Sequence, residues 1–235
     1  LPVLKGRRTC SIKFSKRARE EEFGNVKVKL DCSNTRISMP LAEDGKEESF
    51  EGPFEKMIVP GHTTQVDFYR SGLTILKREL LEGAFRLQTA DFSENFLKNL
   101  PFDLFVKNQI ISEINLSKNQ IRSVPPRLFL GLNQLKSIDL SHNQIGSLNK
   151  LLFKDANSVT QLDLSNNRLL SITRVTLMNM INLQSLDLSS NRFRDLSALK
   201  FDGKQLESIK LGHNNLDKLS MTMFKHLDNV KKGAL

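Results

Sequence analysis

The sequence predicts an α/β solenoid in which each turn of about 24 residues adds one strand to a curved parallel β-sheet. The first observation is a segment of the form L-x-x-L-x-L-x-x-N-x-L, which begins at Leu135 and recurs along the chain. Its asparagine stands at positions 95, 119, 143, 167, 191 and 214, with gaps of 24, 24, 24, 24 and 23 residues. The second observation is that apolar and polar residues alternate within each copy, as they do in a half-buried strand.

The repeats divide the chain into three parts. An earlier copy at 66–73 has Ser71 in place of the asparagine, so seven units are predicted over 63–229. Residues 1–62 are predicted to cap the first turn, with strands within 26–37 and 54–59 and an exposed acidic loop over 41–53. Residues 230–235 match the start of an eighth repeat, so we expect either that the solenoid continues or that another chain covers its end. The isolated fragment is expected to self-associate through the exposed strand edges of its last repeats.

The repeat frame also predicts the interior. We expect each asparagine to turn inward and bond backbone groups of the next turn, which would otherwise be buried without partners. This structural ladder comprises Asn95, Asn119, Asn143, Asn167, Asn191 and Asn214. Ten residues after the asparagines, a buried column is predicted from Phe129, Phe153, Leu177, Phe201 and Phe224. Prolines at 101, 125 and 126 favour short turns or 3₁₀ segments on the convex side.

The asparagine-containing repeat resembles that of extracellular leucine-rich-repeat (LRR) proteins over most of the chain. A cap strand ending in a cysteine, an acidic loop and irregular first repeats are similar to insect LRR immune proteins and Toll-type receptor ectodomains. The resemblance implies a secreted or ectodomain recognition module that binds protein partners or microbial ligands noncovalently, in innate immunity or receptor signalling. The alternative is a cell-adhesion or extracellular-matrix LRR protein that holds glycosaminoglycans through basic patches.

The two cysteines, Cys10 and Cys32, are both near the N-terminus. Their placement favours a disulfide inside the N-terminal cap and therefore an oxidising, extracellular compartment. Such a bond would stabilise the cap by roughly 3 kcal/mol.

No arrangement typical of an enzyme is found. The sequence lacks the HExxH, GxSxG, glycine-rich phosphate-binding and CxxC motifs. The four histidines do not have metal-ligand spacing, so we expect neither a metal nor a cofactor. No stretch approaches 18 consecutive apolar residues, which excludes a membrane-spanning helix in this sequence.

The candidate binding residues lie on the concave strands. One outward position per strand is predicted to hold Asp67, Asp91, Asn115, Asp139, Asp163, Asp187 and Lys210. Nearby strand-end candidates are Tyr69, Arg70, Lys118, His142 and His213. Two interpretations remain open for the aspartates. They are either a consensus feature that bonds neighbouring serine hydroxyls, or a surface that binds a cationic patch on a partner protein or a second copy of the chain.

Two further kinds of site are predicted. Asn115-Leu116-Ser117 is an N-glycosylation sequon, and a glycan there would obstruct the middle of the concave face. Basic residues that would hold a sulfated glycan are Arg7, Arg8, Lys16, Arg17, Arg19, Arg168, Arg174, Arg192 and Arg194. Nucleic-acid binding is not expected, because no aromatic stacking platform accompanies these bases.

Overall fold

The computed structural model describes residues 59, 61–197, 199, 201 and 205–217, together with the backbone of four short strands nearer the N-terminus. Those strands are β1 (Ser11–Lys16), β2 (Val26–Asp31), β3 (Met39–Pro40) and β4 (Glu47–Glu48). The repeats supply β5 (Gln65–Asp67), β6 (Thr89–Asp91), β7 (Glu113–Asn115), β8 (Ser137–Asp139), β9 (Gln161–Asp163), β10 (Ser185–Asp187) and β11 (Ser208–Lys210).

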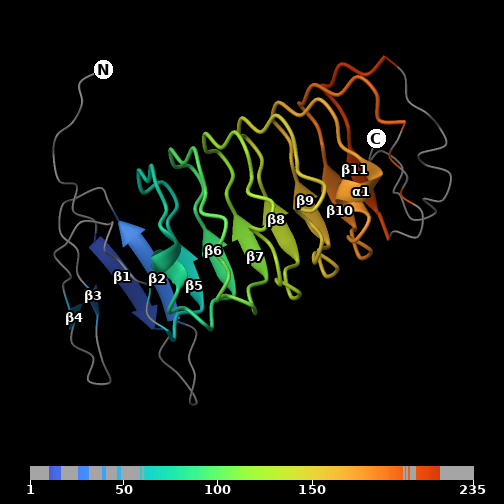
Figure 1. The fold of residues 1–235 in the computed structure, drawn as a ribbon. Helices are drawn as coiled ribbons and strands as arrows, with labels where there is room; N and C mark the ends of the chain where they lie inside the picture. The colour runs from blue at the N-terminus through green and yellow to red at the C-terminus, as the bar shows by residue number, and fades with distance from the viewer. Residues whose placement is uncertain are drawn as a thin grey trace, which may run out of the picture.

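The strands form one sheet of nine in the order β1-β2-β5-β6-β7-β8-β9-β10-β11. From β2 onward every neighbouring pair is parallel and, through the repeats, in register, so that Val66 pairs with Ala90 and Ala90 pairs with Ile114. Figure 1 shows these strands side by side, with the rest of each turn stacked behind the sheet. The predicted parallel solenoid is therefore confirmed, and β2 extends its sheet by one strand beyond the repeats.

The N-terminal strands follow the sequence prediction in part. The strand expected within 26–37 forms over Val26–Asp31, and β1 lies antiparallel to it. Lys29 of β2 holds the register position next to Asp67 of β5. The segment expected to be an exposed loop, 41–53, contains β4, whose two residues pair with β3 just before that segment. Cys10, Cys32 and residues 54–58 lie outside the described residues.

The core consists of the middle residue of each strand and the apolar residues of the turns behind it. The predicted column is buried at Phe129, Phe153, Leu177 and Phe201, while Phe224 lies outside the described residues. Phe105 occupies the same place one turn earlier and is also buried. The rings of Phe129 and Phe153 stack with centroids 5.9 Å apart.

Phenylalanine has other roles that the repeat frame did not predict. Phe68 and Phe92 form a second buried contact just after β5 and β6, with ring centroids 5.4 Å apart. Phe85, Phe96 and Phe102 are exposed. The column therefore explains only part of the high phenylalanine content.

The convex side is short and irregular, as predicted. Its helical segments in the described residues are the 3₁₀ helix η2 (Arg78–Leu81) and the single-turn helix α1 (Arg174–Leu177). One polar residue replaces an apolar one there: the amide of the fully buried Asn108 donates to the carbonyls of Leu81 and Ala84 in the preceding turn. Asn108 thus adds a second hydrogen bond to two carbonyl groups that already accept the backbone N–H groups of Ala84 and Leu87.

The ladder asparagines connect each turn to the preceding one. The Oδ1 atom of Asn143 accepts a hydrogen bond from the backbone N–H of Ile121 at 3.0 Å. Its Nδ2 group donates to the carbonyl of Leu116 in the preceding turn and to those of Leu140 and Ser141 in its own turn, at 3.0–3.1 Å. The expectation that these side chains bond the next turn was wrong in direction. The partners of Asn143 outside its own turn, Ile121 and Leu116, belong to the preceding turn. The same four contacts recur at the other five ladder asparagines.

The residue before each ladder position has a left-handed backbone. These residues are Arg70, Glu94, Lys118, His142, Asn166, Ser190 and His213, with φ between 52° and 57°. A left-handed residue other than glycine is strained by roughly 1–2 kcal/mol. This conformation aims the N–H of His142 at the carbonyl of Ser165 in the next turn, at 3.0 Å. The chain thus bonds forward through this N–H and backward through the ladder side chain.

Candidate functional site

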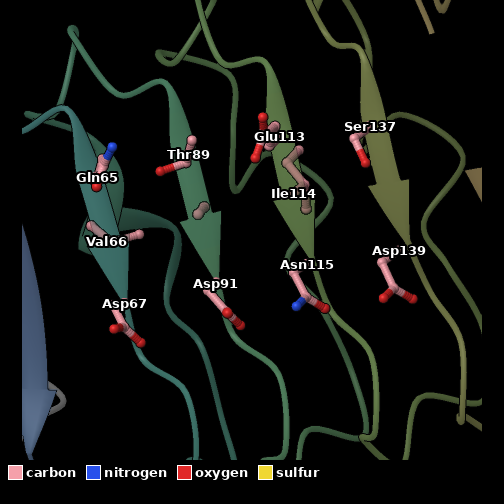
Figure 2. Close-up of a pocket in the computed structure, with 11 residues that line it drawn as sticks. Gln65, Val66, Asp67, Thr89, Asp91, Glu113, Ile114, Asn115, Ser137 and Asp139 are labelled. Carbon is pink, nitrogen blue, oxygen red and sulfur yellow. The ribbon is translucent and has the colours of Figure 1, made fainter. Parts of the chain in front are cut away.

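The concave face of the sheet is the candidate functional site. Each repeat strand buries its middle residue and turns the residues on either side outward. Over β5–β8 the outward residues line a hollow of about 470 Å³. Figure 2 shows Asp67, Asp91, Asn115 and Asp139 in a row at the carboxyl ends of these strands, with Glu113 and smaller polar side chains at the other ends.

The last residues of strands β5 to β10 form what we call the aspartate row. It consists of Asp67, Asp91, Asn115, Asp139, Asp163 and Asp187. In each member, Oδ1 accepts the backbone N–H of the residue two positions later, at distances of 2.8–3.3 Å. In Asn115 the same oxygen also accepts the hydroxyl of Ser117 at 2.7 Å. The row therefore has a structural role, and its side chains are fixed in direction.

Neighbouring members of the row differ in electrostatic environment. Burial raises the pKa of Asp163, outweighing its hydrogen bonds with Ser165, and the charges of Asp139 and Asp187 raise it further. Burial acts on Asp187 in the same direction, but the bonds from Ser189 and Lys210 outweigh it and lower the pKa of Asp187. The Nζ atom of Lys210 lies 2.9 Å from Asp187 Oδ2.

A second polar cluster lies on the turn beside the hollow and centres on Glu94. Its carboxylate accepts the Lys118 ammonium at 2.7 Å and the Tyr69 hydroxyl at 3.2 Å, and it lies 3.5 Å from Arg70. The hydrogen bond from Lys118 is the largest influence that lowers the pKa of Glu94. Tyr69, Arg70 and Lys118 were predicted from the sequence, whereas Glu94 was not. Its place directly before a ladder asparagine is the signal that would have identified it.

The remaining predicted residues are separated from this site. His142 and His213 have the same left-handed backbone three turns apart, and the described residues contain no cluster suited to a metal. Arg168, Arg192 and Arg194 are exposed beyond the ladder, whereas Arg174 begins α1 on the convex side. The N-terminal bases Arg7, Arg8, Arg17 and Arg19 lie outside the described residues, and Lys16 is described only as the last residue of β1.

The opposite pKa shifts predict opposite mutational effects. The raised pKa of Asp163 means that its ionisation costs stability as the pH rises from about 4 to neutrality. Asp163→Asn should therefore raise the free energy of unfolding at pH 7, by up to about 1 kcal/mol, and the gain should disappear near pH 3. Asn115 shows that asparagine can make the same serine contacts.

The matched variant Asp187→Asn should have the opposite sign. The lowered pKa of Asp187 gives stability that is present above pH 4 and lost as the pH falls through the folded-state pKa. Its replacement should cost up to about 1 kcal/mol at pH 7, as expected for an exposed ion pair with Lys210. Urea unfolding at pH 3 and pH 7 measures both variants, and shifts of equal sign would contradict this account.

Comparisons with known proteins agree with this architecture. The family described as leucine rich repeat matches residues 86–145, 134–193, 157–203 and 181–232, which together exceed half of the chain. No curated protein is similar enough in sequence to count as a relative. Neither helical segment in the described part of the chain has the length or apolar composition of a membrane span.

Solved structures share the fold. The LRIM1/APL1C complex is 24% identical over 65% of this chain and 28% of that one, with a TM-score of 0.57. The APL1 leucine-rich repeat domain is 26% identical over 61% and 38%, with a TM-score of 0.58. The TLR13–ssRNA13 complex is 22% identical over 64% and 22%, with a TM-score of 0.59. This chain thus spans less than two fifths of each of those chains, and it belongs to the leucine-rich-repeat family.

Proposed function

We propose that this chain is a noncovalent recognition module that binds a cationic segment of a protein partner across strands β8–β10. The observation that carries the proposal is the charge of the aspartate row. Asp139 and Asp163 are oriented by serine N–H groups at 2.8 Å, and within the described residues neither has a basic partner in hydrogen-bonding contact. Like charges about 4.8 Å apart repel by about 1 kcal/mol in water, and a cationic partner would relieve that repulsion.

The aspartate row forms an acidic surface of limited length. It is acidic on a chain whose formal net charge is +9. A lysine pairs in register with each end of the row: Lys29 of β2 with Asp67, and Lys210 of β11 with Asp187. From Asp139 in β8 to Asp187 in β10 there are two strand spacings, or about 10 Å, which an extended segment of about three residues would span. A partner segment of that length fits between Asn115 and Lys210.

We also propose that the protein is secreted or forms part of an ectodomain, with a glycan on Asn115 and a Cys10–Cys32 disulfide. The side chain of Asn115 is half-buried, and its oxygen is held by Ser117. A glycan on its nitrogen would obstruct the hollow around β7, which is why we assign binding to β8–β10. For the disulfide, the support is that Ser11 pairs with Asp31 in the register of β1 and β2, and these residues adjoin the two cysteines in sequence.

We propose that this recognition module acts in innate immunity or receptor signalling. The structures of similar fold include an LRIM1/APL1C complex and a TLR13–ssRNA13 complex, in which LRR chains are bound to other molecules. The same architecture and an exposed charged face support recognition of a protein or microbial ligand in innate immunity or receptor signalling.

A displayed library of random peptides tests the binding proposal. Peptides enriched on the secreted protein should be rich in lysine and arginine. The double substitution Asp139→Asn/Asp163→Asn keeps the serine contacts but removes two charges, so it should weaken binding of the enriched peptides roughly tenfold. The control Glu79→Gln/Glu82→Gln removes one half-buried and one exposed charge from the convex side and should leave binding unchanged. Enrichment without a charge bias, or equal loss in both variants, would contradict the proposal.

Intact-mass analysis of the secreted protein tests the two covalent proposals. Glycosidase treatment should lower the mass by that of one N-linked glycan, and Asn115→Asp should abolish the change while keeping the row contacts. Reduction should add the mass of two hydrogen atoms per chain. A mass unaffected by the glycosidase would rule out the glycan and return the hollow to the binding surface.

A further inference from the structure

The segments that follow the ladder asparagines carry a row of basic side chains. Along each segment, exposed and buried residues alternate, so that Arg192 and Arg194 point outward on either side of the buried Phe193. Backbone bonds hold these segments next to one another: the N–H of Arg168 donates to Ile145, and that of Arg192 donates to Leu169, both at 2.9 Å. We call the exposed residues Lys98, Arg122, Arg168, Arg192 and Arg194 the basic flank.

The basic flank lacks the counter-ions that other basic residues have. Arg70, Lys118 and Lys210 each lie within 3.5 Å of a carboxylate. In the described part of the chain, no residue of the basic flank has such an ion pair. The four residues after each of the asparagines at 95, 119, 143 and 167 include no acidic residue. Asp195 directly follows Arg194, and Asp217 holds the position equivalent to Arg194 in the next turn, where its N–H donates to the Arg194 carbonyl at 3.1 Å, so the flank ends at Arg194.

The spacing of the flank fits an extended anion. Neighbouring turns are about 4.8 Å apart at the sheet, so Lys98 and Arg194 are separated by four turns, or about 19 Å. Arg168 and Arg192 occupy the same position in adjacent turns and repel each other. An anionic group between them would turn that repulsion into attraction, and guanidinium groups bind sulfate or phosphate oxygens with two parallel hydrogen bonds.

We propose that the basic flank binds a linear sulfated glycan along its length. The site is separate from the aspartate row, because the flank follows each ladder asparagine whereas the row precedes it. A protein can therefore occupy the concave strands while a glycan lies along the flank. One of the basic residues expected from the sequence to hold a sulfated glycan, Arg174, begins α1 on the convex side and is not part of this surface.

The neighbours of the arginines favour a glycan over a nucleic acid. Single-stranded nucleic acids are bound by basic grooves that also offer aromatic side chains on which bases stack. Between Gln120 and Arg194 the exposed residues of these segments are arginine, serine and leucine, the glutamines and the glycine are half-buried, and Phe193 is buried. The exposed Phe96 lies beside Lys98, three turns from Arg168. The arginines thus offer charge and hydrogen bonds without a stacking surface.

Heparin binding by the purified full chain tests the proposal. The variant Arg168→Gln/Arg192→Gln/Arg194→Gln removes three charges from the flank. The matched control Lys107→Gln/Arg127→Gln/Lys150→Gln removes three exposed charges from the convex side. The flank variant should raise the heparin Kd roughly tenfold at 0.15 M salt and lower the slope of log K against log salt by about two. The control should change Kd by less than about twofold, with both variants keeping the wild-type Tm.

Two further ligands, desulfated heparin and a single-stranded RNA, test which chemical class of anion the basic flank binds. Desulfated heparin should bind at least about tenfold more weakly than heparin, and a single-stranded RNA oligonucleotide of similar length should also bind more weakly. Equal losses in the flank and control variants would overturn the proposal in favour of nonspecific attraction to a basic chain. RNA binding as tight as heparin binding, and lost in the flank variant, would overturn it in favour of a nucleic-acid site.

Discussion

The hydrogen bonds of the ladder asparagines are the constraint on which the rest of the structure depends. A solenoid turn ends its strand in the interior, where backbone N–H and C=O groups have no sheet partner and no water. One asparagine per turn bonds four backbone groups near the strand end, as Asn143 does for Ile121, Leu116, Leu140 and Ser141. Because the side chain bonds the same groups in every turn, it fixes the strand end of each turn against that of the preceding turn.

The shorter last gap shows that the ladder does not require one exact repeat length. Asn214 follows its predecessor by 23 residues and makes the same set of contacts. Its bonds to Phe193 and Gly212, at 3.2 and 3.4 Å, are longer than the equivalent bonds of Asn143, whereas its bond to Leu211, at 2.8 Å, is shorter. The loss of one residue is therefore absorbed with all four contacts kept.

The ladder also divides the surface into two regions of opposite charge. Residues just before the left-handed turn carry the aspartate row, and residues just after the asparagine carry the basic flank. The left-handed residue between them changes the chain direction, which places the two regions on different faces. Regular backbone geometry thus converts a short-range sequence pattern into two surfaces of opposite charge, and we propose a partner of the opposite sign for each.

Much of this arrangement could be predicted from the sequence because it is periodic. The ladder asparagines, the buried strand residues and the aspartate row all recur with the repeat. What could not be predicted depends on contacts between turns or on single departures from the pattern. The Glu94 cluster needs side-chain reach across adjacent turns, and Asn108 replaces an apolar residue in one turn only. Lys29 holds the register position next to Asp67 because β2 pairs with β5, and this pairing cannot be predicted from the repeat spacing.

The free energy of unfolding of Asn143→Ala tests the central claim most directly. The substitution leaves the buried Ile121 N–H without a partner, at a cost of about 1–3 kcal/mol. It also removes one hydrogen bond each from the carbonyls of Leu116, Leu140 and Ser141, which keep their bonds from Asn119, Asn167 and Lys118. A loss of about 3 kcal/mol or more is therefore expected in urea unfolding. The control Asn133→Ala changes an exposed asparagine on the convex side and should cost less than about 0.5 kcal/mol. Equal, small losses in the two variants would show that the ladder does not hold the turns together.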